Sequence, residues 1–200
     1  MGRIIKLVFS IIVIFTSILI FNRYDANAKT SYMLSKNNIY TYEFKFTDED
    51  SQEFNSTFTD KYIKKVNGYL VFSHNYDAYK ETKNGLFHSF CTDAPEAPPC
   101  SVETKPLKEI SYPIKVGKTW GYIDTYKKKI IATNLTVKTK AGTFKHVIKV
   151  RLYQSANLGY EDWYDEYYAP NVGLVRTENI FEQESHWMKD LIKLKKIKKH

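Results

Sequence analysis

Short stretches in which apolar and polar residues alternate run through most of the chain beyond residue 38. In 39–46, Ile-Tyr-Thr-Tyr-Glu-Phe-Lys-Phe, aromatic residues alternate with Thr, Glu and Lys. A period of two places one kind of side chain on each face of a β-strand. The same criterion predicts further strands over 54–66, 69–72, 76–82, 86–90, 120–126, 130–138, 143–153, 161–168, 174–181 and 186–197.

Turn signals between these stretches indicate that neighbouring strands are antiparallel. The Asn-Gly pairs at 67–68 and 84–85 favour tight hairpins, because both residues tolerate positive φ. The three lysines at 127–129 are expected to form a solvated turn. Short, evenly spaced strands without a long amphipathic helix are typical of an all-β fold. We therefore expect one antiparallel curved sheet, a half-barrel or barrel of about ten strands, in a single domain over 29–200.

The first 28 residues have the layout of a secretory signal peptide. Arg3 and Lys6 precede an almost uninterrupted apolar run over 7–21, and the segment ends in Ala26-Asn27-Ala28. The run is short for a transmembrane helix, which needs about 20 residues, and the small-x-small ending suits signal peptidase. We expect an N-terminal signal helix that is cleaved near Ala28, which makes the protein secreted or extracytoplasmic. A retained N-terminal membrane anchor is the alternative.

The positive charge of the chain is concentrated at its C-terminus. The full chain carries a formal charge of +8, and the segment 189–200 contains six lysines and one acidic residue. The body is therefore close to neutral, which argues against a nucleic-acid partner. This basic tail is interpreted either as an edge strand with a solvated end or as a segment that binds an anionic envelope polymer or lipid. The candidate surface-binding residues are Lys193, Lys195, Lys196, Lys198 and Lys199.

Cys91 and Cys100 are the two cysteines of the chain, and they bracket a proline-rich segment. Two nearby thiols in an exported protein tend to pair, so we predict a disulfide that closes a small loop. A redox-active pair is disfavoured, because the spacing differs from Cys-x-x-Cys.

Motifs for catalysis are missing from the sequence, and neither a cofactor nor a metal ion is expected. The five histidines are far apart, without ligand-like spacing. Carboxylates beside aromatic residues in 161–166 are compatible with sugar hydrolysis, but a strand splits them between its two faces. The segment therefore favours a solvated, charge-protected strand edge. On this interpretation one face carries Glu161, Trp163 and Asp165, and the other carries Asp162, Tyr164 and Glu166.

Three segments of the second half, 112–120, 137–147 and 167–175, contain the patterns Pro-x-x-x-Gly-x-x-Trp, Ala-Gly-x-Phe and Tyr-Tyr-Ala-x-x-Val-Gly-Leu-Val. In these patterns the region 69–197 resembles a group of uncharacterised exported bacterial β-rich domains. The resemblance implies a curved antiparallel sheet like the half-barrels of periplasmic lipoprotein carriers, and it implies no catalytic residues. We interpret the shared positions as structural, with a ligand-facing role for Trp120 or the tyrosines as the alternative. These positions are Pro113, Gly117, Trp120, Gly142, Phe144, Tyr168, Pro170 and Gly173.

Three functions are compatible with these features. The first is an exported non-catalytic domain that binds an envelope or hydrophobic ligand, or a protein partner, on a curved aromatic-rich sheet. It predicts a concave apolar surface or cavity of several hundred Å³. The second is an envelope polysaccharide hydrolase that uses the acidic residues of 161–166. The third is a secreted immunity or inhibitor protein.

Overall fold

The computed structural model of the chain describes residues 30–47, 52–91, 102, 105–122, 126–154, 163–180 and 186–197. The signal segment predicted over 1–28 lies outside these residues. Ser31–His200 forms one compact unit, and the fold described here is that of this unit. Its described residues form strands and turns. They contain no helix that is long and apolar enough to cross a membrane.

The described strands form a twelve-stranded sheet in which neighbouring strands are antiparallel. They are β1 (Asn38–Thr47), β2 (Glu53–Val66), β3 (Tyr69–Phe72), β4 (Asp77–Thr82), β5 (Gly85–Phe90), β6 (Leu107–Ser111), β7 (Thr119–Tyr122), β8 (Tyr126–Thr139), β9 (Gly142–Gln154), β10 (Trp163–Ala169), β11 (Gly173–Ile180) and β12 (His186–Lys196).

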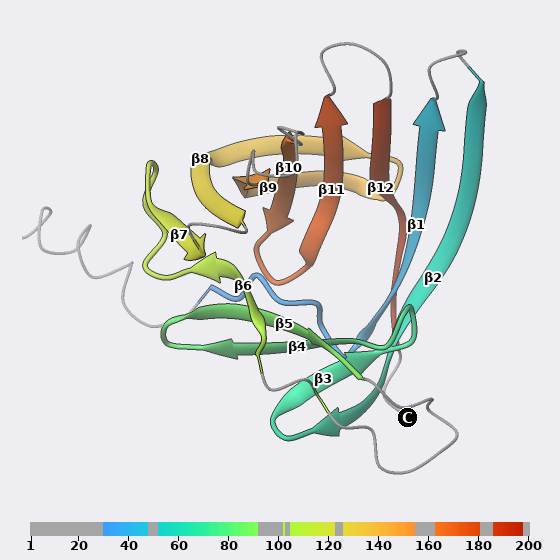
Figure 1. Cartoon of the computed structure of the whole chain (residues 1–200). Helices are drawn as coiled ribbons and strands as arrows, with labels where there is room; N and C mark the ends of the chain where they lie inside the picture. The colour runs from blue at the N-terminus through green and yellow to red at the C-terminus, as the bar shows by residue number, and fades with distance from the viewer. Residues whose placement is uncertain are drawn as a thin grey trace, which may run out of the picture. The chain divides into compact units, whose positions relative to one another are not determined.

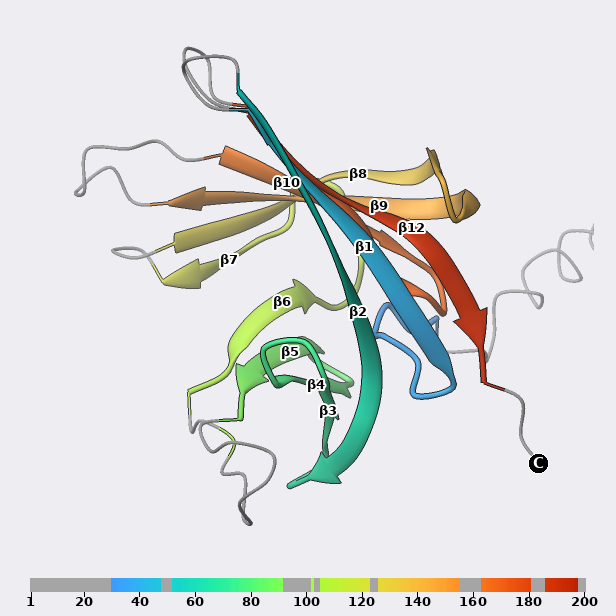
Figure 2. The same cartoon turned by 90° about the vertical axis from the view of Figure 1, so that its right-hand side faces the viewer.

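The sheet consists of two meanders joined through the first and last strands. Its order is β6-β5-β4-β3-β2-β1-β12-β11-β10-β9-β8-β7. β1 pairs with β12 from Asn38, opposite Lys196, to Thr47, opposite His186. Figures 1 and 2 show how β1, β2 and β12 run side by side while the outer strands curl away from them. All other neighbours are consecutive in the chain, which is the arrangement that short hairpin turns dictate.

The predicted Asn-Gly turns are confirmed. Asn67 and Gly68 have φ values of 49° and 86°, and they join β2 to β3. Gly85 begins β5 with a φ of 151°, and a Cβ there would lie 2.1 Å from the carbonyl oxygen of Ile110. Glycine at this position therefore permits β6 to approach β5 closely.

The two edge strands, β6 and β7, meet through side chains. The indole Nε1 of Trp120 on β7 donates a hydrogen bond of 2.7 Å to the carbonyl oxygen of Lys108 on β6. Behind this contact, Ile110 of β6 and Ile130 of β8 belong to one buried apolar cluster. The sheet is thus nearly closed into a barrel, and the prediction of an all-β curved sheet is confirmed, with twelve strands instead of about ten. The unpredicted strand is β6, which is only five residues long.

Residues 31–34 cross the interior between β4 and the β10–β11 hairpin (Figure 1). Asn171 donates its backbone N–H to the carbonyl oxygen of Ser31 at 2.6 Å. Tyr32 donates its backbone N–H to Oε1 of Glu81 at 3.2 Å. Leu34 is 6 % exposed and belongs to the apolar cluster under β1, β9 and β11. This segment therefore fills the interior from a side that the strands leave uncovered.

Two expectations about lysine-rich segments need correction. Residues 127–129 do not form a solvated turn: they lie in β8, and Lys128 is only 3 % exposed. The basic segment is not a tail up to Lys196, because residues 189–196 belong to β12. β12 was expected at an edge, but it lies between β1 and β11, and its pairing with β11 covers His186–Asp190. The charge of these side chains does not show whether they are buried or at an edge, because that depends on which strands lie beside them.

Most positions of the three shared patterns lie at turns or in packing contacts. Gly117, Gly142 and Gly173 have positive φ values of 85°, 144° and 97°. Phe144 packs against the apolar cluster that contains Leu34. The remaining positions are Pro113, which follows a cis peptide bond, Trp120 at the contact between the edge strands, Tyr168 at the interior and Pro170 in the β10–β11 turn.

The predicted disulfide stays a prediction. Cys91 is buried at the end of β5 and forms an isolated β-bridge with Val102. Cys100 lies outside the described residues.

Replacing Trp120 with Phe tests the contact between the edge strands. The variant keeps an aromatic ring but leaves the Lys108 carbonyl without its indole donor, so we expect the free energy of unfolding to fall by about 1–2 kcal/mol. Urea denaturation measures the change. Trp187→Phe is the control, because the Trp187 indole makes no hydrogen bond among the described residues. Equal losses in the two variants would show that the hydrogen bond contributes nothing.

Candidate functional site

The concave side of the sheet lines a cavity of about 1120 Å³ that is open to solvent. A continuous row of paired residues crosses five strands along this side. Ser56 pairs with Phe44, Phe44 with Lys189, Lys189 with Thr177 and Thr177 with Glu166. All five side chains line the cavity. The alternation of each strand therefore sends a mixed set of polar and aromatic groups inward.

Much of the cavity surface is aromatic. The ring centroids of Phe44 and Trp187 are 5.8 Å apart, and those of Tyr164 and Trp187 are 5.7 Å apart. Phe58 stacks on the imidazole of His74 with a centroid distance of 3.7 Å. We call the lining residues Phe44, Phe58, Phe90, Tyr164 and Trp187 the aromatic wall.

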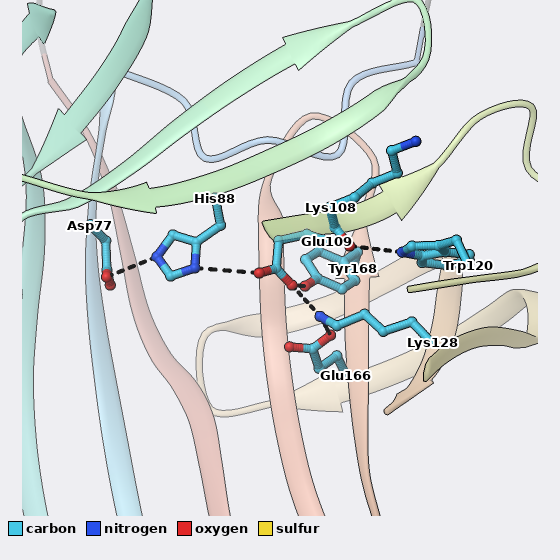
Figure 3. A network of polar contacts seen from close by, with 8 residues as sticks. All are labelled: Asp77, His88, Lys108, Glu109, Trp120, Lys128, Glu166 and Tyr168. Carbon is cyan, nitrogen blue, oxygen red and sulfur yellow. Dashed lines mark hydrogen bonds and ion pairs between the residues drawn. The ribbon is translucent and has the colours of Figure 1, made fainter. Parts of the chain in front are cut away.

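Five charged residues from β4, β5, β6, β8 and β10 form a chain of polar contacts in the cavity (Figure 3). His88 Nε2 lies 3.0 Å from Asp77 Oδ1, and His88 Nδ1 lies 3.3 Å from Glu109 Oε1. Lys128 Nζ donates to Glu109 Oε2 and, at 2.8 Å, to Glu166 Oε2. We call Asp77, His88, Glu109, Lys128 and Glu166 the charged network.

The surroundings of His88 favour its protonated form. Burial opposes the charge, but hydrogen bonds to Asp77 and Glu109 outweigh this effect and raise the pKa of His88 to about 9. At neutral pH the imidazolium therefore donates from both ring nitrogens, one to each carboxylate.

Lys128 lies between two carboxylates and is held as an ammonium group. Burial opposes its charge, but the carboxylates of Glu109 and Glu166 outweigh it and raise the pKa of Lys128. Burial also opposes ionisation of Glu109, yet Lys128 and His88 together hold the pKa of Glu109 below its usual range. Burial raises the pKa of Glu166, and its one ion pair among the described residues, with Lys128, only partly offsets this effect. The network is thus ionised at its centre and carries a more basic carboxylate at one end.

The acidic segment predicted as a candidate for hydrolysis is divided between the two faces of β10. Asp165 points away from the cavity, and its carboxylate accepts two hydrogen bonds from Arg151 at 2.7 and 2.8 Å and one from Lys149 at 2.6 Å. Glu166 and Tyr164 line the cavity. The expected division between faces is therefore confirmed for these residues, while Glu161 and Asp162 lie outside the described ones. The expectation of a solvated strand edge is wrong, because β10 lies between β9 and β11.

The candidate lysines of the C-terminal segment are not brought to the cavity. Lys193 and Lys195 are exposed on β12, opposite Thr41 and Ile39. Lys196 ends the strand, and Lys198 and Lys199 lie outside the described residues. Tyr168, by contrast, lines the cavity, and its hydroxyl donates to Glu109 Oε2 at 3.4 Å. Within the described ranges, no group of three His, Cys, Asp or Glu residues is arranged to hold a metal ion.

The sequence interpretation missed His88, Glu109, Lys128 and Lys189 as residues of one site. The alternation of β5 is a usable signal for His88, because Leu86, His88 and Phe90 share a face. Glu109 and Lys128 carry no such signal, since β6 is short and Lys128 lies within a run of lysines.

No protein-family model matches the sequence, and no curated protein matches it significantly. Among solved structures, the chain is similar to a protein of Bacteroides fragilis that has a YmcC-like fold and is inferred to be exported. The two are 15% identical, the match covers 84% of this chain and 100% of the other, and the TM-score is 0.50. A protein of Parabacteroides distasonis inferred to be a lipoprotein matches at 13% identity over 84% of this chain and 100% of its own, with a TM-score of 0.39. The first likeness shows a shared fold, in agreement with the curved sheet that the sequence resemblance implied; the motifs of that resemblance stay a prediction.

The charge state of His88 is testable by NMR titration of the histidine side chains. We expect His88 to titrate near pH 9, whereas burial lowers the pKa of His74 below its usual value. Because the pKa of His88 is raised in the folded state, its contribution to stability is complete below about pH 6.5 and disappears as the pH rises through 9. Asp77→Asn should lower the titration midpoint of His88. A midpoint at or below the ordinary value would contradict the assigned contacts.

Replacing Lys128 with Met tests the centre of the charged network. The variant removes the cation that two buried carboxylates share and leaves only His88 beside Glu109, so we expect the free energy of unfolding to fall by about 3–5 kcal/mol. Adding Glu109→Gln and Glu166→Gln should recover much of the loss. Lys127→Met is the matched control, because Lys127 is exposed on the same strand and its removal should change stability by less than about 0.5 kcal/mol. A similar loss in both single variants would refute a special role for Lys128.

Proposed function

We propose that this chain is an exported, non-catalytic binding protein that holds a hydrophobic or amphipathic envelope molecule inside its curved sheet. The observation that carries the proposal is the cavity of about 1120 Å³ with its aromatic wall. Ligand cavities in proteins measure about 300–1,000 Å³ and are mostly apolar with a few polar groups. The cavity is slightly larger than this range and has a mixed apolar and polar lining, which suits a large ligand of this kind.

The pairing of the interior charges favours binding over catalysis. Each carboxylate of the charged network contacts His88 or Lys128. A general acid or base has to reach a substrate proton, whereas these groups are engaged with one another. Hydrolysis by the acidic strand has less support still, because Asp165 is bound to Arg151 and Lys149 away from the cavity.

Export is supported by the signal-peptide layout of residues 1–28 and by the fold shared with a protein inferred to be exported. The exposed lysines of β12 lie outside the cavity and would serve a separate contact with anionic envelope polymer or lipid.

Binding of the uncharged fluorescent probe N-phenyl-1-naphthylamine tests the proposal directly. The full chain is expressed and the resulting protein is purified. We expect this protein to bind the probe, with a rise in fluorescence. Ser56→Trp places an indole in the cavity from β2, so it should weaken binding by at least about tenfold, equivalent to 1.4 kcal/mol. Fluorescence titration gives the two dissociation constants.

Asn55→Trp is the matched control, because Asn55 is the neighbour of Ser56 on the same strand and does not line the cavity. It should leave the dissociation constant unchanged. If the wild-type protein does not bind the probe, or if both tryptophan variants weaken probe binding equally, the cavity is not a binding site. The immunity or inhibitor function would then be the one to pursue, with a protein partner.

A further inference from the structure

We propose that Lys189 is the point at which the cavity holds an acidic headgroup, so that the ligand is a single-chain anionic amphiphile. The inference rests on the proposed binding function and specifies its ligand class. It follows from the position of one lysine relative to the aromatic wall and the charged network.

Lys189 lies in the middle of the inward-facing row. On β12 it pairs with Phe44 of β1 on one side and with Thr177 of β11 on the other. Thr177 separates it from Glu166, the last member of the charged network. The residue is therefore placed between the apolar and the polar part of this row.

The ammonium group of Lys189 has no oxygen partner among the described residues. No hydrogen bond or ion pair within the described ranges involves it, whereas Lys128 has two carboxylates. Its Nζ instead lies 5.3 Å from the ring centroid of Tyr42 and 5.9 Å from that of Phe58. Aromatic faces attract a cation but leave its hydrogen-bond donors unused.

The environment of Lys189 disfavours an isolated charge. Burial lowers the pKa of Lys189, and the carboxylates of Asp77 and Glu166 only partly offset this effect. Those carboxylates are already bound to His88 and Lys128. An incoming anion would supply the oxygen acceptors that the protein itself does not provide.

The charge balance of the cavity is compatible with an anion. His88 is protonated at neutral pH, and burial keeps His74 neutral by lowering its pKa. Asp60 is buried close by, but it does not line the cavity and accepts hydrogen bonds from the backbone N–H of His74 and the hydroxyl of Ser73. Among the described lining residues the acidic side chains are Asp77, Glu109 and Glu166, and the basic ones besides His74 are His88, Lys105, Lys128 and Lys189, while Asp60 also acts on Lys189 from outside the lining.

The aromatic wall continues from Lys189 and offers a surface for an apolar chain. Phe44 is its direct neighbour in the sheet, and Trp187 lies two residues before it on the same face of β12. A ligand with its head at Lys189 and its chain along Phe44 and Trp187 would leave Lys128 and its partners undisturbed. A hydrocarbon chain without a head, or a compact polar sugar, would use only part of this surface.

Competition against N-phenyl-1-naphthylamine distinguishes the ligand classes. Oleate, oleyl phosphate and oleyl alcohol share a chain and differ in their heads. We expect at least one of the two acids to displace the probe from wild-type protein about tenfold more tightly than the alcohol, because a charge-assisted contact is stronger than a neutral one. Whether oleate or oleyl phosphate shows the preference distinguishes a carboxylate headgroup from a phosphate headgroup.

Variants of Lys189 assign the preference to this residue. Lys189→Met should remove the preference while binding of the alcohol and the probe is kept, and Lys189→Arg should retain it. Lys193→Met is the matched control, because Lys193 is exposed on the same strand and should leave all values unchanged. Equal binding of acids and alcohol, or a preference that survives in Lys189→Met, overturns the inference but leaves the proposed function intact. Failure of the wild-type protein to bind the probe would overturn both.

Discussion

The ammonium group of Lys128 between Glu109 and Glu166 is the interaction on which the rest of this structure depends. Glu109 lies on β6 at one edge of the sheet, while Lys128 and Glu166 lie on β8 and β10 near the other. Among the described residues no backbone pairing joins the edge strands β6 and β7, so side chains hold them together. A buried ion pair of this kind contributes little net stability compared with apolar packing, but it strongly penalises arrangements that separate its members. It therefore specifies how the curved sheet closes.

The same charges also explain why the interior is a cavity and not a packed core. A barrel interior filled with Leu, Ile and Val excludes water and ligands alike. Here both apolar clusters contribute to the cavity lining, one through Leu34 and the other through Leu86 and Tyr168, and much of the remaining lining is charged or aromatic. Burying a charged group there costs free energy unless the group has a partner. The members of the charged network are partners of one another, whereas Lys189 has no such partner among the described residues. Structure and proposed function are thus linked through one set of residues.

Local rules predicted the strands well, because they depend on neighbours in sequence. The alternation of 39–46 and the Asn-Gly turns need no distant contact, and both are confirmed. The site depends instead on register between strands far apart in the chain, and bulges such as the one between Leu86 and Phe87 shift that register. Lys128 shows the limit most clearly: three consecutive lysines look solvated until the carboxylate of Glu109, 19 residues away, is placed beside the middle one. Hydropathy cannot show which charge of a run is buried.

The pairing of β1 with β12 joins residues at opposite ends of the domain, with Asn38 opposite Lys196. Contacts of such long sequence separation are slow to form, since the chain entropy of the whole intervening segment is lost before they contribute. The meander of β1 to β6 and that of β7 to β11 each have only local pairings. During folding both halves can form hairpins before the last strand is in place, and until then their inner faces stay open to solvent. The cavity is therefore a late product of folding, and the strand that bears Lys189 is the one that completes it.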